Sequence, residues 1–164
     1  MEEKRPKLLE SFRWLNVTQF LGALNDNIFK LLTILFIIGV WGDEKASIVT
    51  AFAGAVFVMP FLVFLPYAGR LADRLSKRDI VVWTKFSEVA VMLAGVGAFL
   101  IGRFWPMNAV WALYAVLFLM ASQSAFFGPS KYGIIPELVG THEITRANSF
   151  IDALTYFAIV IGTA

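Results

Sequence analysis

The sequence predicts an all-α membrane protein, and both its composition and the spacing of its apolar residues indicate this. Of the 164 residues, 59% are hydrophobic and 15% aromatic, whereas 16% are charged. A typical soluble domain carries about 25% charged residues. The apolar residues gather in five stretches, each close to or longer than the roughly 20 residues with which a helix crosses a bilayer core. We therefore expect transmembrane helices at about residues 15–40, 48–68, 80–102, 106–128 and 147–164.

The five stretches differ in the charges that they carry. The first is interrupted by Asp26 and Lys30, whereas the second and fourth contain no Asp, Glu, Lys, Arg or His. The third carries Lys85 and Glu88 near its start, and the fifth carries Asp152. Because the fifth stretch is still apolar where the sequence stops, we expect the chain to be the front portion of a longer protein or a shortened version of one.

Basic residues predict the orientation of these helices, since the cytoplasmic loops of membrane proteins carry an excess of Lys and Arg. The connection after the first helix contains one basic residue, Lys45, and the connection after the third contains one, Arg103. The basic residues on the other side of the membrane are Lys4, Arg5, Lys7, Arg13, Arg70, Arg74, Lys77, Arg78, Lys131 and Arg146. We therefore expect a cytoplasmic N-terminal segment at residues 1–14, with residues 15–164 forming part of a transmembrane bundle.

A polar stripe runs along the first helix. An Asp or Lys at mid-membrane costs about 2.5 to 3.5 kcal/mol on the insertion scale, so such groups are expected to face the bundle interior and to serve a function. At about 100° per residue, Asn25 and Asp26 share a face with Lys30 at its edge, and Asn27 points the other way. We expect this face to bind the polar part of a cargo. Alternatively, Asp26 and Lys30 only pair with each other at i, i+4.

Two further helices carry polar groups within their expected spans. Glu88 on the third helix is a candidate cargo contact, or else a structural partner of Lys85 or Lys30. On the fifth helix, Asn148 and Asp152 lie one helical turn apart and begin a second polar stripe. Glu88, Asn148 and Asp152 are therefore candidate substrate-binding residues.

Lys131 stands at the expected cytoplasmic end of the fourth helix, shortly after Gly128 and Pro129. A backbone freed by the proline and one flexible ammonium are suited to binding a phosphate. A lysine at such a helix end otherwise serves as a topology anchor. The sequence leaves both interpretations of Lys131 open.

The connection between the second and third helices contains the segment Gly-Arg-Leu-Ala-Asp-Arg-Leu-Ser-Lys-Arg at residues 69–78. It resembles the signature G-x-L-A-D-R-x-G-R-R of the major facilitator superfamily, with departures at Ser76 and Lys77, whereas a plain positive-inside loop would explain only the basic residues. The members of the implied conformational motif are Gly69, Asp73, Arg74 and Arg78. We expect a tight turn at Gly69 and an Asp73 carboxylate that pairs with basic residues or caps a helix.

Three further segments resemble the bacterial lysophospholipid transporter branch of that superfamily. They are Phe-Leu-Gly-Ala-Leu-Asn-Asp-Asn at 20–27, Gly-Pro-Ser-Lys-Tyr-Gly-Ile-Ile-Pro-Glu-Leu at 128–138 and Ala-Asn-Ser-Phe-Ile-Asp-Ala at 147–153. The resemblance implies the first five helices of a major facilitator fold with inverted three-helix repeats, and a missing C-terminal half of the transporter. Some members of the branch are fused to an acyltransferase and an acyl-carrier-protein ligase, and a glutamate often stands at the position of Asp152.

The same resemblance implies transport of lysophospholipid inward across the bacterial inner membrane for re-acylation. On this hypothesis Asp26 and its asparagine neighbours engage the amine or hydroxyl part of the headgroup. Lys131 or Lys30 attracts the phosphate, and the acyl chain lies along apolar walls. The expected partners are the lysophospholipid or another amphipathic solute, the lipid bilayer and the C-terminal half.

Other classes of function lack support in the sequence. It contains no cysteine, no phosphate-binding loop and no nucleophile motif, so we expect no catalytic site, metal site or cofactor. No surface rich in basic and aromatic residues indicates nucleic acid. Two alternatives stay open: a major facilitator that moves another small amphipathic solute, and a non-transporting membrane scaffold made of these five helices alone.

Overall fold

Five long helices make up most of the structure, a computed structural model that describes residues 4–164. The first three residues of the expected N-terminal segment, and the side chains of residues 4–7 and of Thr141, lie outside the described part. The helices are α1 (Lys4–Trp41), α2 (Ala46–Arg74), α3 (Lys77–Gly102), α4 (Pro106–Leu138) and α5 (Ile144–Thr163). Two short 3-10 turns, η1 (Asp43–Lys45) and η2 (Thr141–Glu143), precede α2 and α5.

The predicted all-α membrane fold is confirmed. Each of the five helices is long and apolar enough to cross a membrane, and the described residues contain no strand. Large apolar side chains cover the outside of the bundle: Leu62, Trp83 and Leu93 are 75%, 72% and 67% exposed. Such extensive apolar exposure is typical of a surface that contacts lipid. The cytoplasmic position of the N-terminus stays a prediction.

The helices extend beyond the predicted apolar spans, because apolar length marks a membrane crossing and not the end of a helix. Lysine, arginine and leucine are good helix formers, so α1 begins at Lys4, before its apolar stretch. Helix α4 continues through Pro129 and Pro136 to Leu138. Membrane helices tolerate such prolines where neighbouring groups satisfy the freed backbone.

Local residues explain the short connections. Gly42, directly after α1, has φ +93°, a conformation that glycine adopts without steric cost. Ser76 caps α3, because its side chain accepts a hydrogen bond from the Asp79 backbone N–H at 3.4 Å. Pro106 lies in the first turn of α4, where its missing N–H costs nothing.

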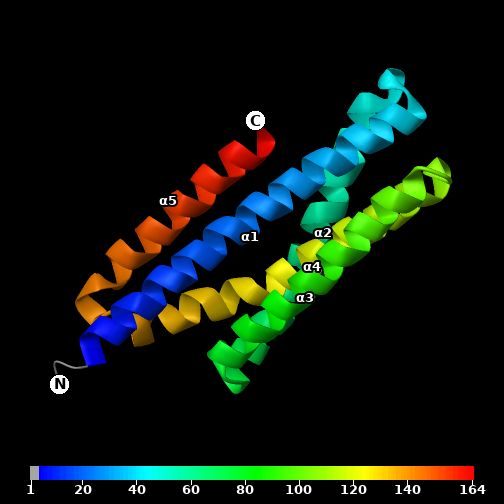
Figure 1. Cartoon of the computed structure of the whole chain (residues 1–164). Helices are drawn as coiled ribbons and strands as arrows, with labels where there is room; N and C mark the ends of the chain where they lie inside the picture. The colour runs from blue at the N-terminus through cyan, green and yellow to red at the C-terminus, as the bar shows by residue number, and fades with distance from the viewer. Residues whose placement is uncertain (1–3) are drawn as a thin grey trace.

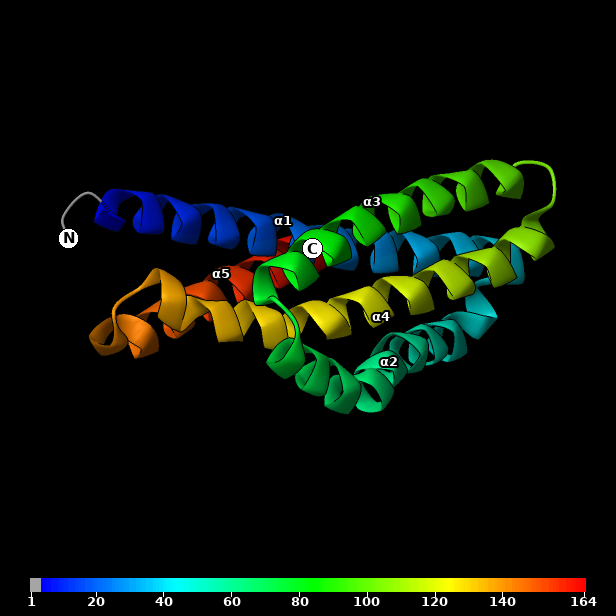
Figure 2. The same ribbon diagram turned by 90° about the horizontal axis from the view of Figure 1, so that it is seen from below.

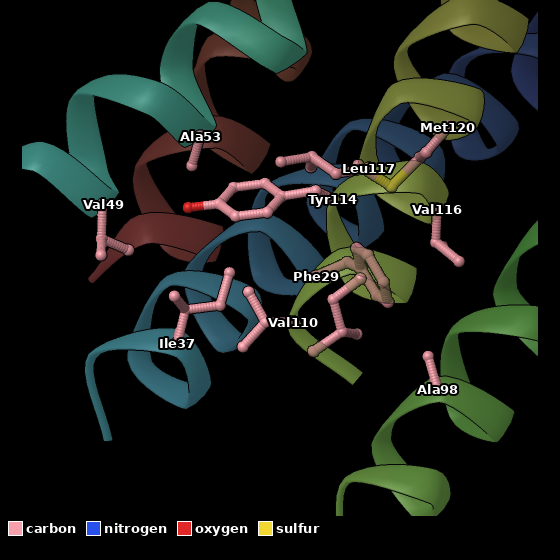
Figure 3. Packing of buried hydrophobic residues seen from close by; sticks show 11 residues of the cluster. Phe29, Ile37, Val49, Ala53, Ala98, Val110, Tyr114, Val116, Leu117 and Met120 are labelled. Atoms are coloured by element: carbon pink, nitrogen blue, oxygen red, sulfur yellow. The ribbon is translucent and has the colours of Figure 1, made fainter. Parts of the chain in front are cut away.

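Helix α4 is the centre of the bundle. It packs against α1, α2 and α3, whereas α5 lies along α1 and touches α4 only slightly (Figures 1 and 2). One cluster of buried apolar side chains joins α4 to α1, α2 and α3 (Figure 3), and it includes Phe29, Ile37, Val49, Ala98 and Leu117. A second cluster joins α1, α4 and α5 and includes Leu15, Phe127 and Ile151. The parts of α1 and α4 that lie between these clusters carry most of the buried polar residues.

Two glycines of α3 lie beneath phenylalanine rings of α1. A Cβ atom on Gly95 would lie 2.5 Å from Phe29 Cε2, and one on Gly102 would lie 2.5 Å from Phe36 Cζ. Both glycines are buried. The glycines thus make room for phenylalanine rings of α1, whereas the backbone of α3 packs most extensively against α4.

We predict that Gly95→Ala destabilises the bundle. The Phe29 ring is buried beside Phe99, 5.8 Å between centroids, and has little room to move, so the added methyl group should cost about 1 to 3 kcal/mol. Thermal unfolding in detergent micelles measures the effect. Gly97→Ala on the same helix is the control, because no atom lies within 4 Å of its added Cβ. Equal midpoints for the two variants would contradict the prediction.

Candidate functional site

A cavity of about 440 Å³ lies between α1, α3, α4 and α5, with two aromatic side chains of α2 in its wall. We call it the polar cavity. Its polar and charged lining residues are Gln19, Asp26, Asn27, Lys30, Lys85, Glu88, Gln123, Ser124, Lys131, Tyr132 and Thr155. Its aromatic lining residues besides Tyr132 are Phe57, Phe61 and Phe127. The cavity thus combines charged groups of both signs with apolar surface, inside helices of membrane-spanning length.

Asp26 is held by a residue of the central helix. Its side chain is 8% exposed, and Ser124 Oγ donates a hydrogen bond to Asp26 Oδ2 at 2.7 Å. Gln123 Nε2 in turn donates to Ser124 Oγ at 3.0 Å. The second carboxylate oxygen, Oδ1, is buried and has no hydrogen-bond partner in the described structure. The expectation that Asp26 faces the bundle interior is therefore met, and its partner comes from α4.

Lys30 does not form the ion pair with Asp26 that was the alternative interpretation. Its Nζ donates to Asn27 Oδ1 at 3.1 Å and lies 5.0 Å from the centroid of the Phe57 ring, within the range of a cation–π contact. Asn27 is also buried and lines the cavity, so the expectation that it points away was wrong. Because α4 and α5 cover α1 from two sides, a wider sector of α1 is buried than its polar stripe indicated.

Lys85 and Glu88 form an ion pair on α3, with 2.6 Å between Lys85 Nζ and Glu88 Oε2. The ammonium also lies 4.6 Å from the centroid of the Phe127 ring. A Cβ atom on Gly22 would lie 2.6 Å from Lys85 Nζ, so the absence of a side chain on α1 admits this ammonium. The structural role of Glu88 as partner of Lys85 is confirmed, and its contact with a cargo stays a prediction.

Lys131 lies inside the bundle and not at a helix end. Its side chain is 5% exposed, it lines the polar cavity, and α4 continues beyond it to Leu138. Its Nζ lies 4.3 Å from the centroid of the Tyr132 ring, and the Tyr132 hydroxyl donates to Asp152 Oδ1 at 2.5 Å. Asp152 is therefore connected to the cavity through Tyr132. Lys131 is thus placed at the cavity, and its role in binding stays a prediction.

Three of the expected binding residues, Asn25, Asn148 and Asp152, are not among the residues that line the polar cavity, although Asp152 is connected to it through Tyr132. Asn25 lines a neighbouring groove of about 790 Å³ between α1 and α3, whose walls are mostly apolar. Asn148 on α5 is half-buried, and its Oδ1 has no hydrogen-bond partner among the described residues. Conversely, Gln123, Ser124 and Tyr132 were not expected. The adjacent polar residues Gln123 and Ser124, in an apolar stretch without charges, were the available signal.

The conformational motif departs from expectation at its beginning. Gly69 lies within α2 and forms no turn, because the helix continues to Arg74. Ser76 has φ −60°, so glycine is not required there. Asp73 is exposed, and neither ion pair of the described residues includes it. The N-terminus of α3 is capped by Ser76 instead.

The motif is joined to α4 by Lys77. Its Nζ lies 2.8 Å from Glu137 Oε1. A Cβ atom on Gly133 would lie 3.2 Å from Lys77 Cδ and Cε, so the lysine side chain crosses α4 at a glycine. Gly133 and Glu137 belong to the segment 128–138 that also contains Lys131. The two sequence segments are thus in direct contact.

Comparison with known proteins gives a consistent result. The chain is 26% identical over 147 residues to the lysophospholipid transporter LplT of Salmonella arizonae and 27% identical over 147 residues to that of Escherichia fergusonii. It is 26% identical over 150 residues to that of Escherichia coli K12. The resemblance to lysophospholipid transporters is confirmed.

These similarities cover 90% of this chain and 33% of each relative. The chain therefore spans about one third of the length of the curated relatives that it matches. No family model matches the chain, and no solved structure does. The relatives bear the name of transporters and not of enzymes, in agreement with the expectation of a non-enzyme.

We predict that the Lys77–Glu137 pair contributes little to stability. Its side chains are 34% and 61% exposed, and exposed ion pairs contribute about 0.2 to 1 kcal/mol. A double-mutant cycle with Lys77→Ala and Glu137→Ala, followed by unfolding in detergent micelles, gives the coupling energy. Asp73→Ala combined with Glu137→Ala is the control and should show no coupling. A coupling energy of several kcal/mol for the Lys77 cycle would contradict this prediction.

Proposed function

We propose that this chain forms part of a transporter that moves lysophospholipid across the bacterial inner membrane. The observation that carries the proposal is the polar cavity, which places buried cationic and anionic side chains beside aromatic walls within membrane-length helices. Such residues inside membrane segments serve a function as a rule. The similarity to lysophospholipid transporters along 90% of the chain supports this cargo over another small solute and over a scaffold.

The chemistry of a lysophospholipid matches the cavity. Its phosphate is an anion, for which Lys131 and Lys30 are flexible cationic partners. Its ethanolamine or glycerol group supplies N–H or O–H donors, for which the Asp26 carboxylate is an acceptor. Its single acyl chain requires apolar surface, as the phenylalanine side chains of the cavity provide. Glu88 and Asp152 are proposed to bind the headgroup more weakly, since each already has a partner.

Movement of such a cargo requires the cavity to open to each side of the membrane in turn. In major facilitators this is achieved by rocking two bundles of helices against each other around a site at mid-membrane. We propose that α1 to α5 belong to one of these bundles. Asn25 and Asn148, which lie outside the cavity lining, are proposed to reach the cargo only when the bundles rearrange.

Loss of the charges of Asp26 and Lys131 should abolish headgroup binding. In the protein expressed from its complete coding sequence, we expect Asp26→Ala combined with Lys131→Ala to lower uptake of labelled lysophosphatidylethanolamine at least about tenfold, since two charge-assisted hydrogen bonds are lost. Uptake into right-side-out membrane vesicles, normalised to the amount of protein, measures this. Glu44→Ala combined with Lys45→Ala, two exposed residues of η1, is the control. Uptake retained by the first pair would refute the assignment.

Asp73 is proposed to act in conformational change and not in cargo binding, because it is exposed and far along α2 from the cavity lining. We expect Asp73→Asn to lower the turnover of all lysophospholipids by the same factor. Uptake of lipids with ethanolamine and glycerol headgroups, assayed in parallel, gives the ratio. A change in this ratio with unchanged turnover of one lipid would show that Asp73 contacts the headgroup.

A further inference from the structure

Two buried oxygen atoms in the polar cavity have no hydrogen-bond partner. They are Asp26 Oδ1 on α1 and Gln123 Oε1 on α4. Their side chains are 8% and 9% exposed, respectively, and both line the cavity. An unpaired buried acceptor is costly, and such groups in native structures call for an explanation. Both atoms are acceptors, and a carboxylate oxygen beside an amide oxygen is suited to binding a cation.

The hydrogen bonds of Ser124 fix which atoms are left free. Ser124 has one hydroxyl proton, and it is donated to Asp26 Oδ2 at 2.7 Å. The contact of 3.0 Å with the Gln123 amide must then be one in which Ser124 accepts. The amide nitrogen of Gln123 therefore faces Ser124, and the amide oxygen remains as an acceptor. Among Asp26, Gln123 and Ser124, the buried side-chain atoms that have no partner are therefore both oxygens.

Three of the nearby donors on α1 and α3 are engaged elsewhere, and Asn25, whose Nδ2 is buried without a partner, lines the neighbouring groove. Lys30 donates to Asn27 at 3.1 Å, and Lys85 is paired with Glu88 at 2.6 Å. Asn27 donates its amide to the Ala23 carbonyl at 2.8 Å. Neither asparagine neighbour of Asp26 therefore donates to its carboxylate, and their contact with a cargo stays a prediction.

We propose that Asp26 and Gln123 form a subsite for a monovalent cation, and that Ser124 is the positioning residue that orients both. The shared chemistry is a single positive charge offered to a carboxylate oxygen and an amide oxygen. The ammonium of an ethanolamine headgroup supplies it, as does an alkali metal ion. Binding of the headgroup ammonium rests on the proposed function, whereas the existence of the subsite does not depend on that function.

Substitution of Ser124 tests the subsite through headgroup preference. Two lysophospholipids with the same acyl chain, one with ethanolamine and one with glycerol, are taken up by the complete protein in proteoliposomes. If the ammonium is the occupant, Ser124→Ala raises the KM for the ethanolamine lipid about tenfold relative to that for the glycerol lipid, because a charged hydrogen bond exceeds a neutral one. Ser124→Thr, which keeps the hydroxyl, restores the ratio.

Ser122→Ala is the matched control. Ser122 lies on the same helix, is half-buried, and donates at 2.7 Å to the Phe118 carbonyl of its own helix. Ser122→Ala should leave the KM ratio unchanged.

The same assay with sodium chloride replaced by tetraethylammonium chloride tests whether an alkali metal ion is the occupant. An alkali ion in the subsite makes wild-type uptake of both lipids depend on sodium, and Ser124→Ala removes that dependence without changing the headgroup ratio.

Either of these results supports the subsite, whereas a Ser124→Ala variant that matches Ser122→Ala in both headgroup ratio and sodium dependence overturns it. If the wild-type protein takes up neither lipid, the proposed function fails, and the subsite is tested without transport. The thermal midpoint of the purified protein is then measured with added sodium chloride or ethanolamine hydrochloride. A rise in the wild type and Ser122→Ala that is lost in Ser124→Ala supports the subsite. No rise, or an equal rise in all three, overturns it.

Discussion

The hydrogen bond from Ser124 to Asp26 connects the two helices around which the others pack. Helices α2 and α3 pack against α4, and α5 packs against α1. A carboxylate among apolar helices is satisfied most directly by a donor on another helix, because lipid supplies none. Hydrogen bonds between membrane helices average only about 0.6 kcal/mol, so this contact matters less for stability than for alignment. It brings the polar parts of α1 and α4 together between two apolar clusters.

The sequence predicted the fold and part of the site for physical reasons that can be named. Apolar length alone identified the five helices, because a bilayer imposes a minimum span. The cost of burying Asp26, Lys30 and Lys131 identified them as residues of interest, and all three line one cavity. The ends of the helices were harder to predict, since Ser76 and the good helix formers near Lys4 act independently of the membrane.

The remaining features depend on contacts between helices, which periodicity along one helix does not contain. Ser124 and Asp26 are 98 residues apart in the sequence, and neither residue alone indicates the other. Gln123 is neutral and carries no desolvation signal comparable to that of a charge. Asn27 was assigned to the wrong side because the burial of α1 by α5 was unknown. The family signature likewise predicted a turn at Gly69, whereas a local cap at Ser76 determines where the connection lies.

Gly22 and Lys85 illustrate how one contact restricts sequence change. The Lys85 ammonium occupies the space in which a side chain at position 22 would begin, 2.6 Å from its Cβ. A side chain at position 22 would displace the Lys85 ammonium, the mobile end of a flexible side chain, and would thereby shift its pairing with the Glu88 carboxylate. The geometry of the Lys85–Glu88 pair therefore depends on the missing side chain at position 22 of another helix.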